Sequence, residues 1–417
     1  MRRLGRHKLL ALLAVIGPGV ITSAADNDAA GIITYAQAGA KYRFDLLWVI
    51  VLITFVLAMV QEMSARMGTI TQKGLGELIR ENFGVKWAMF ALGTLFVANL
   101  GVTVADFAGI AMSLEIFGLP RYITVPTAAL VIWLLVVRGS FRVVEKAFMA
   151  IMVLYATYIV SGFMARPDWG EVFRSVYSPN LGSLHTRPDF LFLTIAVIGT
   201  TITPWMQFFL QATVVDKGVR VEDYPYEKLD VFVGSFLTDL VSFFIIISTA
   251  VMIYDANGGP VPIQNAAEAA AALRPAAHGY AEKLFALGLL GASLLGAAVV
   301  PLSTAYSYCE AFGWEIGISR RFHEAPTFYS IYTLCILVGV VVVLLPSVHL
   351  VNTMIGAQGV NGILLPVILV FMLKLVNSRD VMNGYVNSRT YNVVVWLTAV
   401  VLIAMTLAWL VGTLLGY

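Results

Sequence analysis

The sequence predicts an all-α polytopic membrane protein with about eleven transmembrane helices. Of its 417 residues, 59% are hydrophobic and 12% are charged, and the mean hydropathy of +0.83 is too high for a soluble protein. Apolar runs of about 20 residues, the length that crosses a bilayer, recur along the chain, and two of them are interrupted by Gly, Pro and polar residues. The runs lie near 9–40, 45–66, 87–115, 121–138, 143–165, 189–215, 229–254, 282–308, 326–346, 350–374 and 391–415.

The first and sixth apolar segments carry the residues that interrupt a helix. Residues 17–31 read GPGVITSAADNDAAG, with a Gly-Pro-Gly and two aspartates where a plain membrane anchor would carry leucines. Residues 199–207 read GTTITPWMQ, with small hydroxyl residues and a proline. The two breaks fall in helices 1 and 6, which are corresponding positions in a five-plus-five inverted repeat. In such transporters unwound carbonyls and a carboxylate meet an ion at mid-membrane.

We expect one transmembrane transporter domain over residues 1–417, with repeats at about 9–165 and 189–374 and an extra helix at 391–415. Most lysines and arginines fall on one set of loops, which predicts a cytoplasmic N-terminus and an external C-terminus in the plasma (inner) membrane. No hydrophilic stretch is long enough for a soluble catalytic domain, so we expect no enzyme. The net charge of +2 is small and its basic residues are dispersed, which excludes nucleic acid as a partner and leaves the lipid bilayer and small ions. The oligomeric state stays open.

Acidic residues inside apolar segments are the candidates for function, because a charge at the bilayer centre costs about 2.5–3.5 kcal/mol on insertion scales. Glu62 has Arg66 one helical turn away, which favours a structural ion pair. Asp106 and Asp239 stay open between a functional and a purely structural role. Asp28 is the strongest candidate, because the glycines and alanines around it leave backbone carbonyls free to face a cation.

These residues also carry a family resemblance. Residues 17–52, GPGVITSAADNDAAGIITYAQAGAKYRFDLLWVIVL, resemble the first two helices of the NRAMP divalent-metal transporters, whose pattern is GPG, then DPGN, AGAK and LLWV. AQGVNGILLPVILVFML, from Ala357 to Leu373, is similar to helix 10 of that family. The resemblance spans nearly the whole chain. It implies the LeuT-type fold and places the family's metal-binding aspartate at Asp28.

The departures from the family pattern point to a different ion. The ligand asparagine of DPGN becomes Gly31, and in helix 6 the thioether ligand becomes Thr203 and the histidine becomes Trp205. Thioether sulfur favours softer transition metals, whereas oxygen donors and water suit Mg²⁺, which keeps several waters. The resemblance therefore implies a subgroup of NRAMP-related magnesium transporters, with Mg²⁺ as transported substrate, Mn²⁺ also carried, and no resident cofactor. The candidate metal-site residues are Asp28, Gly31, Thr200, Thr203, Asp26, Gln207 and Gln358.

Proton coupling is expected to be weak or absent. The helix 3 aspartate of proton-coupled relatives corresponds to Thr103 here, and their helix 6 histidine positions hold Trp205 and Leu210. All five histidines lie in loops or at helix ends, so no imidazole relay crosses the membrane. We therefore predict facilitative transport down the electrochemical gradient.

Three alternatives remain. The first is an ordinary proton-coupled Mn²⁺/Fe²⁺ symporter of the same family. The second is an organic-solute transporter on the same fold, against which the acidic pair Asp26 and Asp28 argues. The third, an intramembrane aspartyl protease, lacks a GxGD motif; its superficial match, Tyr254-Asp255, sits at the end of an apolar segment. The amides Gln358 and Asn361 are equally open between holding water around an ion and bonding between helices.

Overall fold

The computed structural model describes residues 18–138, 155–179, 188–316 and 322–415. This part of the chain is helical and contains no strand. Nine of its helical segments are long and apolar enough to span a membrane. They are α4 (Leu47–Thr71), α6 (Val85–Glu115), α7 (Arg121–Arg138), α11 with α12 (Pro188–Thr201 and Pro204–Asp216), α13 (Tyr224–Thr249, extended at both ends), α16 (Ala281–Phe312), α17 (Pro326–Leu344), α18 (Leu350–Val376) and α20 (Arg389–Leu414).

The two other predicted segments are also accounted for. The first is divided into two short helices, α2 (Pro18–Asp26) and α3 (Ala29–Tyr42). Most of the fifth, 143–165, lies outside the described residues, and 155–164 is helical. Nine of the eleven predicted segments are therefore present as spanning helices in the described chain, the first is present as a broken pair, and most of the fifth lies outside the described residues.

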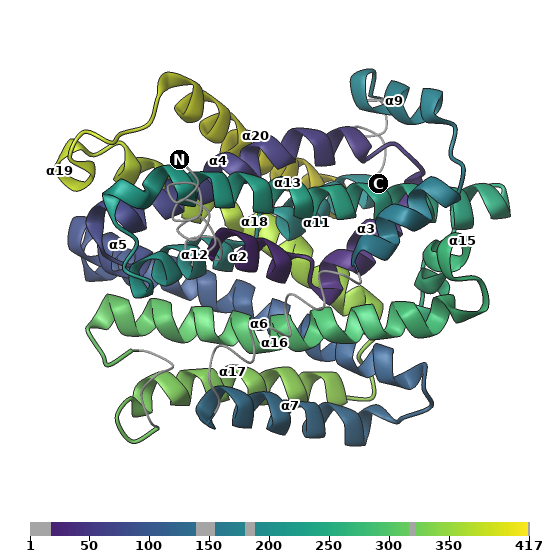
Figure 1. Ribbon diagram of the computed structural model, residues 1–417, viewed down its shortest axis with the longest axis horizontal. Helices are drawn as coiled ribbons and strands as arrows, with labels where there is room; N and C mark the ends of the chain where they lie inside the picture. The colour runs from purple at the N-terminus through teal and green to yellow at the C-terminus, as the bar shows by residue number, and fades with distance from the viewer. Residues whose placement is uncertain (1–17, 139–154, 180–187, 317–321, 416–417) are drawn as a thin grey trace, which may run out of the picture.

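Short elements cap the two ends of the bundle. In Figure 1, α5 (Leu75–Phe83) and α19 (Arg379–Met382) lie at one end, and α9 (Trp169–Tyr177) and α15 (Arg274–Ala277) lie at the opposite end. The loops expected on opposite sides of the membrane are thus at opposite ends. The remaining short pieces are α14 (Ala266–Ala269), the 3-10 turns Val221–Asp223, Asp255–Asn257, Ala270–Leu273 and His278–Tyr280, and the π-helical turn Ala250–Tyr254.

Both predicted helix breaks are present, and local chemistry explains them. Asp28 has extended backbone angles (φ −68°, ψ 173°) and caps α3 with its side chain. Thr203 is also extended (φ −78°, ψ 141°) because it precedes Pro204, whose ring disfavours a helical residue before it. Pro204 itself starts α12, where its missing N–H costs nothing.

The broken helices lie inside the bundle. α13 packs along α2, α3 and α4, while α6 packs against α16 and α18. Figure 1 shows α7 and α17 together at one edge, beyond α16. The predicted ion pair is confirmed: Arg66 Nε lies 3.2 Å from Glu62 Oε1 within α4.

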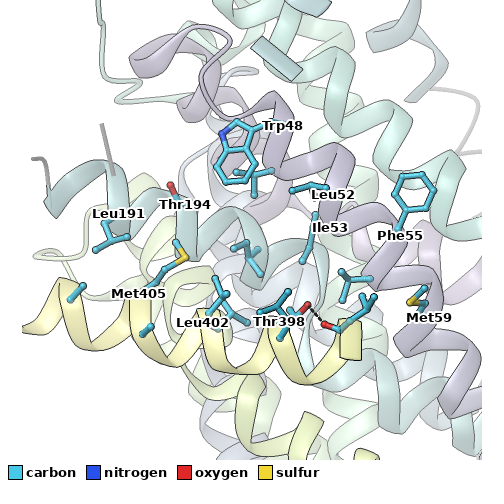
Figure 2. A pocket seen from close by; sticks show the side chains of 18 residues that line it. Trp48, Leu52, Ile53, Phe55, Met59, Leu191, Thr194, Thr398, Leu402 and Met405 are labelled. Carbon is cyan, nitrogen blue, oxygen red and sulfur yellow. Dashed lines mark hydrogen bonds between the residues drawn. The ribbon is translucent and has the colours of Figure 1, made fainter. Parts of the chain in front are cut away.

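An apolar groove of about 720 Å³ separates α20 from α4 and α11. Figure 2 shows Trp48, Leu52 and Ile53 of α4, Leu191 of α11, and Leu402 and Met405 of α20 around it. The hydroxyl of Thr398 is bonded to the Val394 carbonyl of its own helix, as Thr194 is to Phe190. A groove with this lining accommodates hydrocarbon and offers no ligand to an ion.

Glycine allows α11 and α18 to touch. A Cβ added at Gly199 would overlap the carbonyl oxygen of Gln358 and the backbone nitrogen of Gly362. Small residues at such crossings let membrane helices approach closely. This contact holds the second broken helix against the helix that carries Gln358.

We predict that Gly199→Ala destabilises the folded protein by about 1–3 kcal/mol, the usual cost of overpacking, and therefore lowers its melting temperature. The measurement is the melting temperature, taken from the fraction of protein that stays monodisperse in detergent after heating. Gly93→Ala is the matched control, because a Cβ at Gly93 in α6 meets no atom within 4 Å. Equal melting temperatures for the two variants would contradict the close contact.

Candidate metal site

Asp28 stands at the first break and is 2% exposed. Its Oδ1 accepts a 2.6 Å hydrogen bond from the backbone N–H of Gly31, as expected of a residue that caps a helix. The Gln358 side chain from α18 donates to both carboxylate oxygens, at 3.3 and 3.2 Å. The structure thus places two predicted site residues, far apart in sequence, in direct contact.

Asn361 fixes the direction of the Gln358 amide. Its Nδ2 donates to Gln358 Oε1 over 2.7 Å, within the same helix. With its oxygen held in this way, the Gln358 Nε2 points at Asp28. The bond between helices that sequence reasoning considered for Asn361 is not the one observed; its amide donates within α18 and acts through Gln358.

Oxygen atoms crowd one face of Gly31. A Cβ built there would lie 2.9 Å from Thr200 Oγ1, 3.2 Å from Asp28 Oδ1 and 3.4 Å from the Asp26 carbonyl oxygen. Thr200 Oγ1 is buried and has no hydrogen-bond partner among the described residues. Three potential oxygen ligands therefore lie close together at Gly31, where even a methyl group would force one of them to shift.

Asp26 and Thr203 meet beside Gly31. The carbonyl of Asp26 faces Gly31, and its carboxylate lies within electrostatic range of both Asp239 of α13 and Asp28. The Thr203 side chain lies next to the Asp26 carboxylate. The structure thus brings both predicted residues close to Gly31, Asp26 through its carbonyl and Thr203 through its contact with Asp26.

Gln207 lies one helical turn beyond the second break. Its Nε2 donates to the Thr203 carbonyl at 3.3 Å, and its Oε1 accepts from Ser64 of α4 at 3.4 Å. The described contacts join it to the break and to α4, not to Asp28. Gln207 thus orders the backbone of the unwound segment.

Sequence reasoning missed Asn27. Its Nδ2 donates to the carbonyl (3.2 Å) and hydroxyl (3.1 Å) oxygens of Thr238, and its Oδ1 accepts from Ser242 at 3.2 Å. Its carbonyl accepts a 2.7 Å bond from the Tyr155 hydroxyl. A buried amide in an unwound stretch was the available signal, but its partners lie more than 100 residues away in sequence.

Asp106 and Thr103 occupy different environments on α6. Both carboxylate oxygens of Asp106 are buried without a hydrogen-bond partner in the described chain, and the group packs against Gly296 of α16. Thr103 donates to the Asn99 carbonyl of its own helix at 2.8 Å. Asp106 is close enough to Asp28 for the two charges to interact.

The donors around Asp28 are oxygen atoms and one amide. Within the described residues, no three His, Cys, Asp or Glu side chains converge as they do around a metal held by protein ligands alone. The thioether nearest in sequence to the second break, that of Met206, accepts a 3.6 Å contact from Gln61 of α4. This chemistry fits a hard cation that retains water.

Solved structures with this architecture are membrane transporters. A manganese transporter of Eremococcus coleocola, solved as a mutant, matches with a TM-score of 0.78 and 20% identity, covering 97% of this chain and 88% of that one. MhsT, solved with L-phenylalanine, matches with a TM-score of 0.56 and 13% identity over 98% of both chains. The expected LeuT-type transporter fold, with helices 1 and 6 interrupted, is thereby confirmed.

Sequence comparison then gives the family. Residues 19–412 match the family model described as natural resistance-associated macrophage protein-like, Nramp. The chain belongs to this family. It is also 27% identical to the divalent metal cation transporter MntH of Deinococcus radiodurans, over 97% of this chain and 91% of that protein.

We predict that Asn361→Leu weakens divalent-cation binding by about 10-fold, because residues that orient a ligand typically contribute 10–100-fold to affinity. Freed from Asn361, the Gln358 amide no longer has a fixed direction toward Asp28. The measurement is isothermal titration of the purified protein with Mn²⁺. Asn377→Leu, at the end of α18 where the amide bonds Asn392, is the control; an equal loss there would refute a positioning role for Asn361.

Proposed function

We propose that this protein is a facilitative transporter of divalent metal cations that favours Mg²⁺ and also carries Mn²⁺. The observation that carries this proposal is the cluster of oxygen atoms at Gly31, where the Thr200 hydroxyl, the Asp26 carbonyl and the Asp28 carboxylate lie close together with no thioether among them. Mg²⁺ binds through one or two carboxylates and keeps several waters. Mn²⁺ also binds oxygen well, so discrimination between the two is modest.

The residues at the two breaks support a hydrated ion. Gly31 places no side chain between Asp28 and Thr200, and Thr203 is shorter than a methionine at that position. The Thr200 and Thr203 hydroxyls have no hydrogen-bond partner among the described residues, so both are available to bound water. Water-mediated contacts are nearly as favourable as direct hydrogen bonds.

The same residues support transport without protons. Trp205, 1% exposed, fills the position at which coupled relatives are expected to carry a histidine, and the Thr103 hydroxyl is bonded within its own helix. Neither side chain titrates near neutral pH. We propose that the ion moves through a single domain of two repeats, in a plasma (inner) membrane and with a cytoplasmic N-terminus.

A second candidate is a proton-coupled Mn²⁺ symporter. Two observations favour it. Asp106 is a buried carboxylic acid without a hydrogen-bond partner in the described chain and interacts electrostatically with Asp28. The similar proteins described above are a manganese transporter and a divalent metal cation transporter. An amino-acid substrate fits less well, because the described ion pairs include no cationic side chain at Asp26 or Asp28 to receive its carboxylate.

We predict saturable Mg²⁺ uptake into proteoliposomes with no acidification of the lumen, measured with metal- and pH-sensitive dyes enclosed in the vesicles. Asp28→Asn should abolish uptake, because it removes the charge from the ion's main ligand. Asp189→Asn is the control, since that carboxylate is 82% exposed at the start of α11. Mn²⁺ entry accompanied by acidification, with no response to Mg²⁺, would establish the symporter instead.

We predict that Thr203→Met changes selectivity toward softer ions. A thioether beside Asp26 should strengthen binding of Mn²⁺ relative to Mg²⁺ by about 10-fold or more, because sulfur favours transition metals over Mg²⁺. Competition between the two ions in uptake by the variant and the wild type measures this ratio. Thr213→Met, near the end of α12, is the control. Unchanged affinities for both ions in Thr203→Met would refute the role assigned to the hydroxyl.

A further inference from the structure

A second pair of carboxylates lies beside the Asp28 site. Asp26 ends α2, and Asp239 lies near the middle of α13; each is 2% exposed. The two groups are close enough to repel each other electrostatically. None of their four carboxylate oxygens has a hydrogen-bond partner among the described residues.

Hydrogen bonds between the end of α2 and α13 hold these two acids near each other. Asn27, next to Asp26, bonds Thr238 and Ser242, which flank Asp239 on α13. The Thr238 hydroxyl also donates to the Ser23 carbonyl of α2. Four hydrogen bonds therefore attach α2 and Asn27 to α13, and the attachment keeps the two acids near each other.

Further oxygen atoms surround the pair. Thr203, 1% exposed, has a hydroxyl without a hydrogen-bond partner in the described chain, and it lies beside Asp26. Thr54 of α4 lies beside Asp239 and donates its proton to the Ile50 carbonyl at 2.7 Å, which leaves its lone pairs available. The Tyr35 hydroxyl, paired with Thr201 at 2.9 Å, also lies within electrostatic range of both acids.

In the described chain, no positively charged side chain pairs with these two acids. Asp26 also stands at the C-terminus of α2, where the helix dipole is negative and disfavours an anion. Buried acids in a membrane are retained where they pair or bind ions, and the carbonyl ends of broken helices coordinate monovalent cations in transporters.

We propose that Asp26 and Asp239 hold a second hard cation, separate from the divalent ion at Asp28, and that it is monovalent. Asp26 is the last residue of α2, and the carbonyl ends of broken helices are where transporters coordinate monovalent cations. An ion such as Na⁺, bound by the two carboxylates and by the hydroxyls of Thr203 and Thr54, relieves the repulsion between Asp26 and Asp239. This second ion is inferred whichever divalent cation occupies Asp28.

The test is equilibrium dialysis of the full-length protein in detergent with radioactive Na⁺, at saturating Mg²⁺ and with choline as the background cation. We expect about one Na⁺ per chain, and at least about a 10-fold weaker Na⁺ affinity in Asp239→Asn, because ligand charge sets cation affinity. Mg²⁺ affinity of Asp239→Asn should change far less. Asp28→Asn should show the reverse, losing Mg²⁺ and keeping Na⁺, so failure at one position is distinguishable from failure at the other.

Two further variants secure the interpretation. Thr54→Val nearly conserves shape and should also weaken Na⁺ binding, which covers the case in which Asp239→Asn does not fold. Asp189→Asn, an exposed carboxylate, should bind both ions as the wild type does. Absence of Na⁺ binding in the wild type, Na⁺ binding unchanged in Asp239→Asn, or a second Mg²⁺ in place of Na⁺ would each overturn the proposal.

Discussion

Unwound backbone in the middle of a membrane bundle must find its polar partners inside the protein, because hydrocarbon provides none. In this chain the Asn27 carbonyl accepts from the Tyr155 hydroxyl, and the Ser23 carbonyl of α2 accepts from the Thr238 hydroxyl of α13. The Asp28 side chain satisfies the first turn of α3, and Gln207 satisfies the carbonyl of Thr203 at the other break. Once these groups are bonded, the atoms left over, chiefly carboxylate and hydroxyl oxygens, are the ones an ion can use.

The helix breaks and the central carboxylate were predictable because their signals are local. A proline fixes the residue before it in an extended conformation, so Thr203 and Pro204 mark a break in any apolar segment. Aspartate among alanines within a membrane span is equally visible, and Gly31 could be recognised as missing a ligand by its resemblance to a known pattern. The prediction that Gln358 belongs to the site of Asp28 depended on that resemblance, because only the folded chain brings α18 to the first break.

What the sequence did not reveal depends on packing between distant segments. The bonds that hold Asn27, and with it the neighbouring Asp26, against α13 are made by Thr238 and Ser242, which carry no distinctive sequence signal. The approach of α11 to α18 at Gly199 is likewise a property of two surfaces, since Gly362 must also lack a side chain. Asp239 was left undecided for the same reason: an acid within a helix gains meaning only from the groups it faces.

The short connection between the two carboxylate positions has a thermodynamic consequence. Asp26 ends α2 and Asp28 caps α3, only two residues further on, and the Asp26 carbonyl faces Gly31 while its carboxylate interacts with Asp239. An ion at either position therefore alters the charge and the backbone geometry felt by an ion at the other. Such coupling is reciprocal. If a bound monovalent ion changes the affinity for the divalent ion by some factor, a bound divalent ion changes the affinity for the monovalent ion by the same factor. Because cations bind the folded protein at these buried acids, they also stabilise the packing of α2 and α3 on α13 by mass action. Ion binding and the integrity of the first broken helix are thus one equilibrium in this fold.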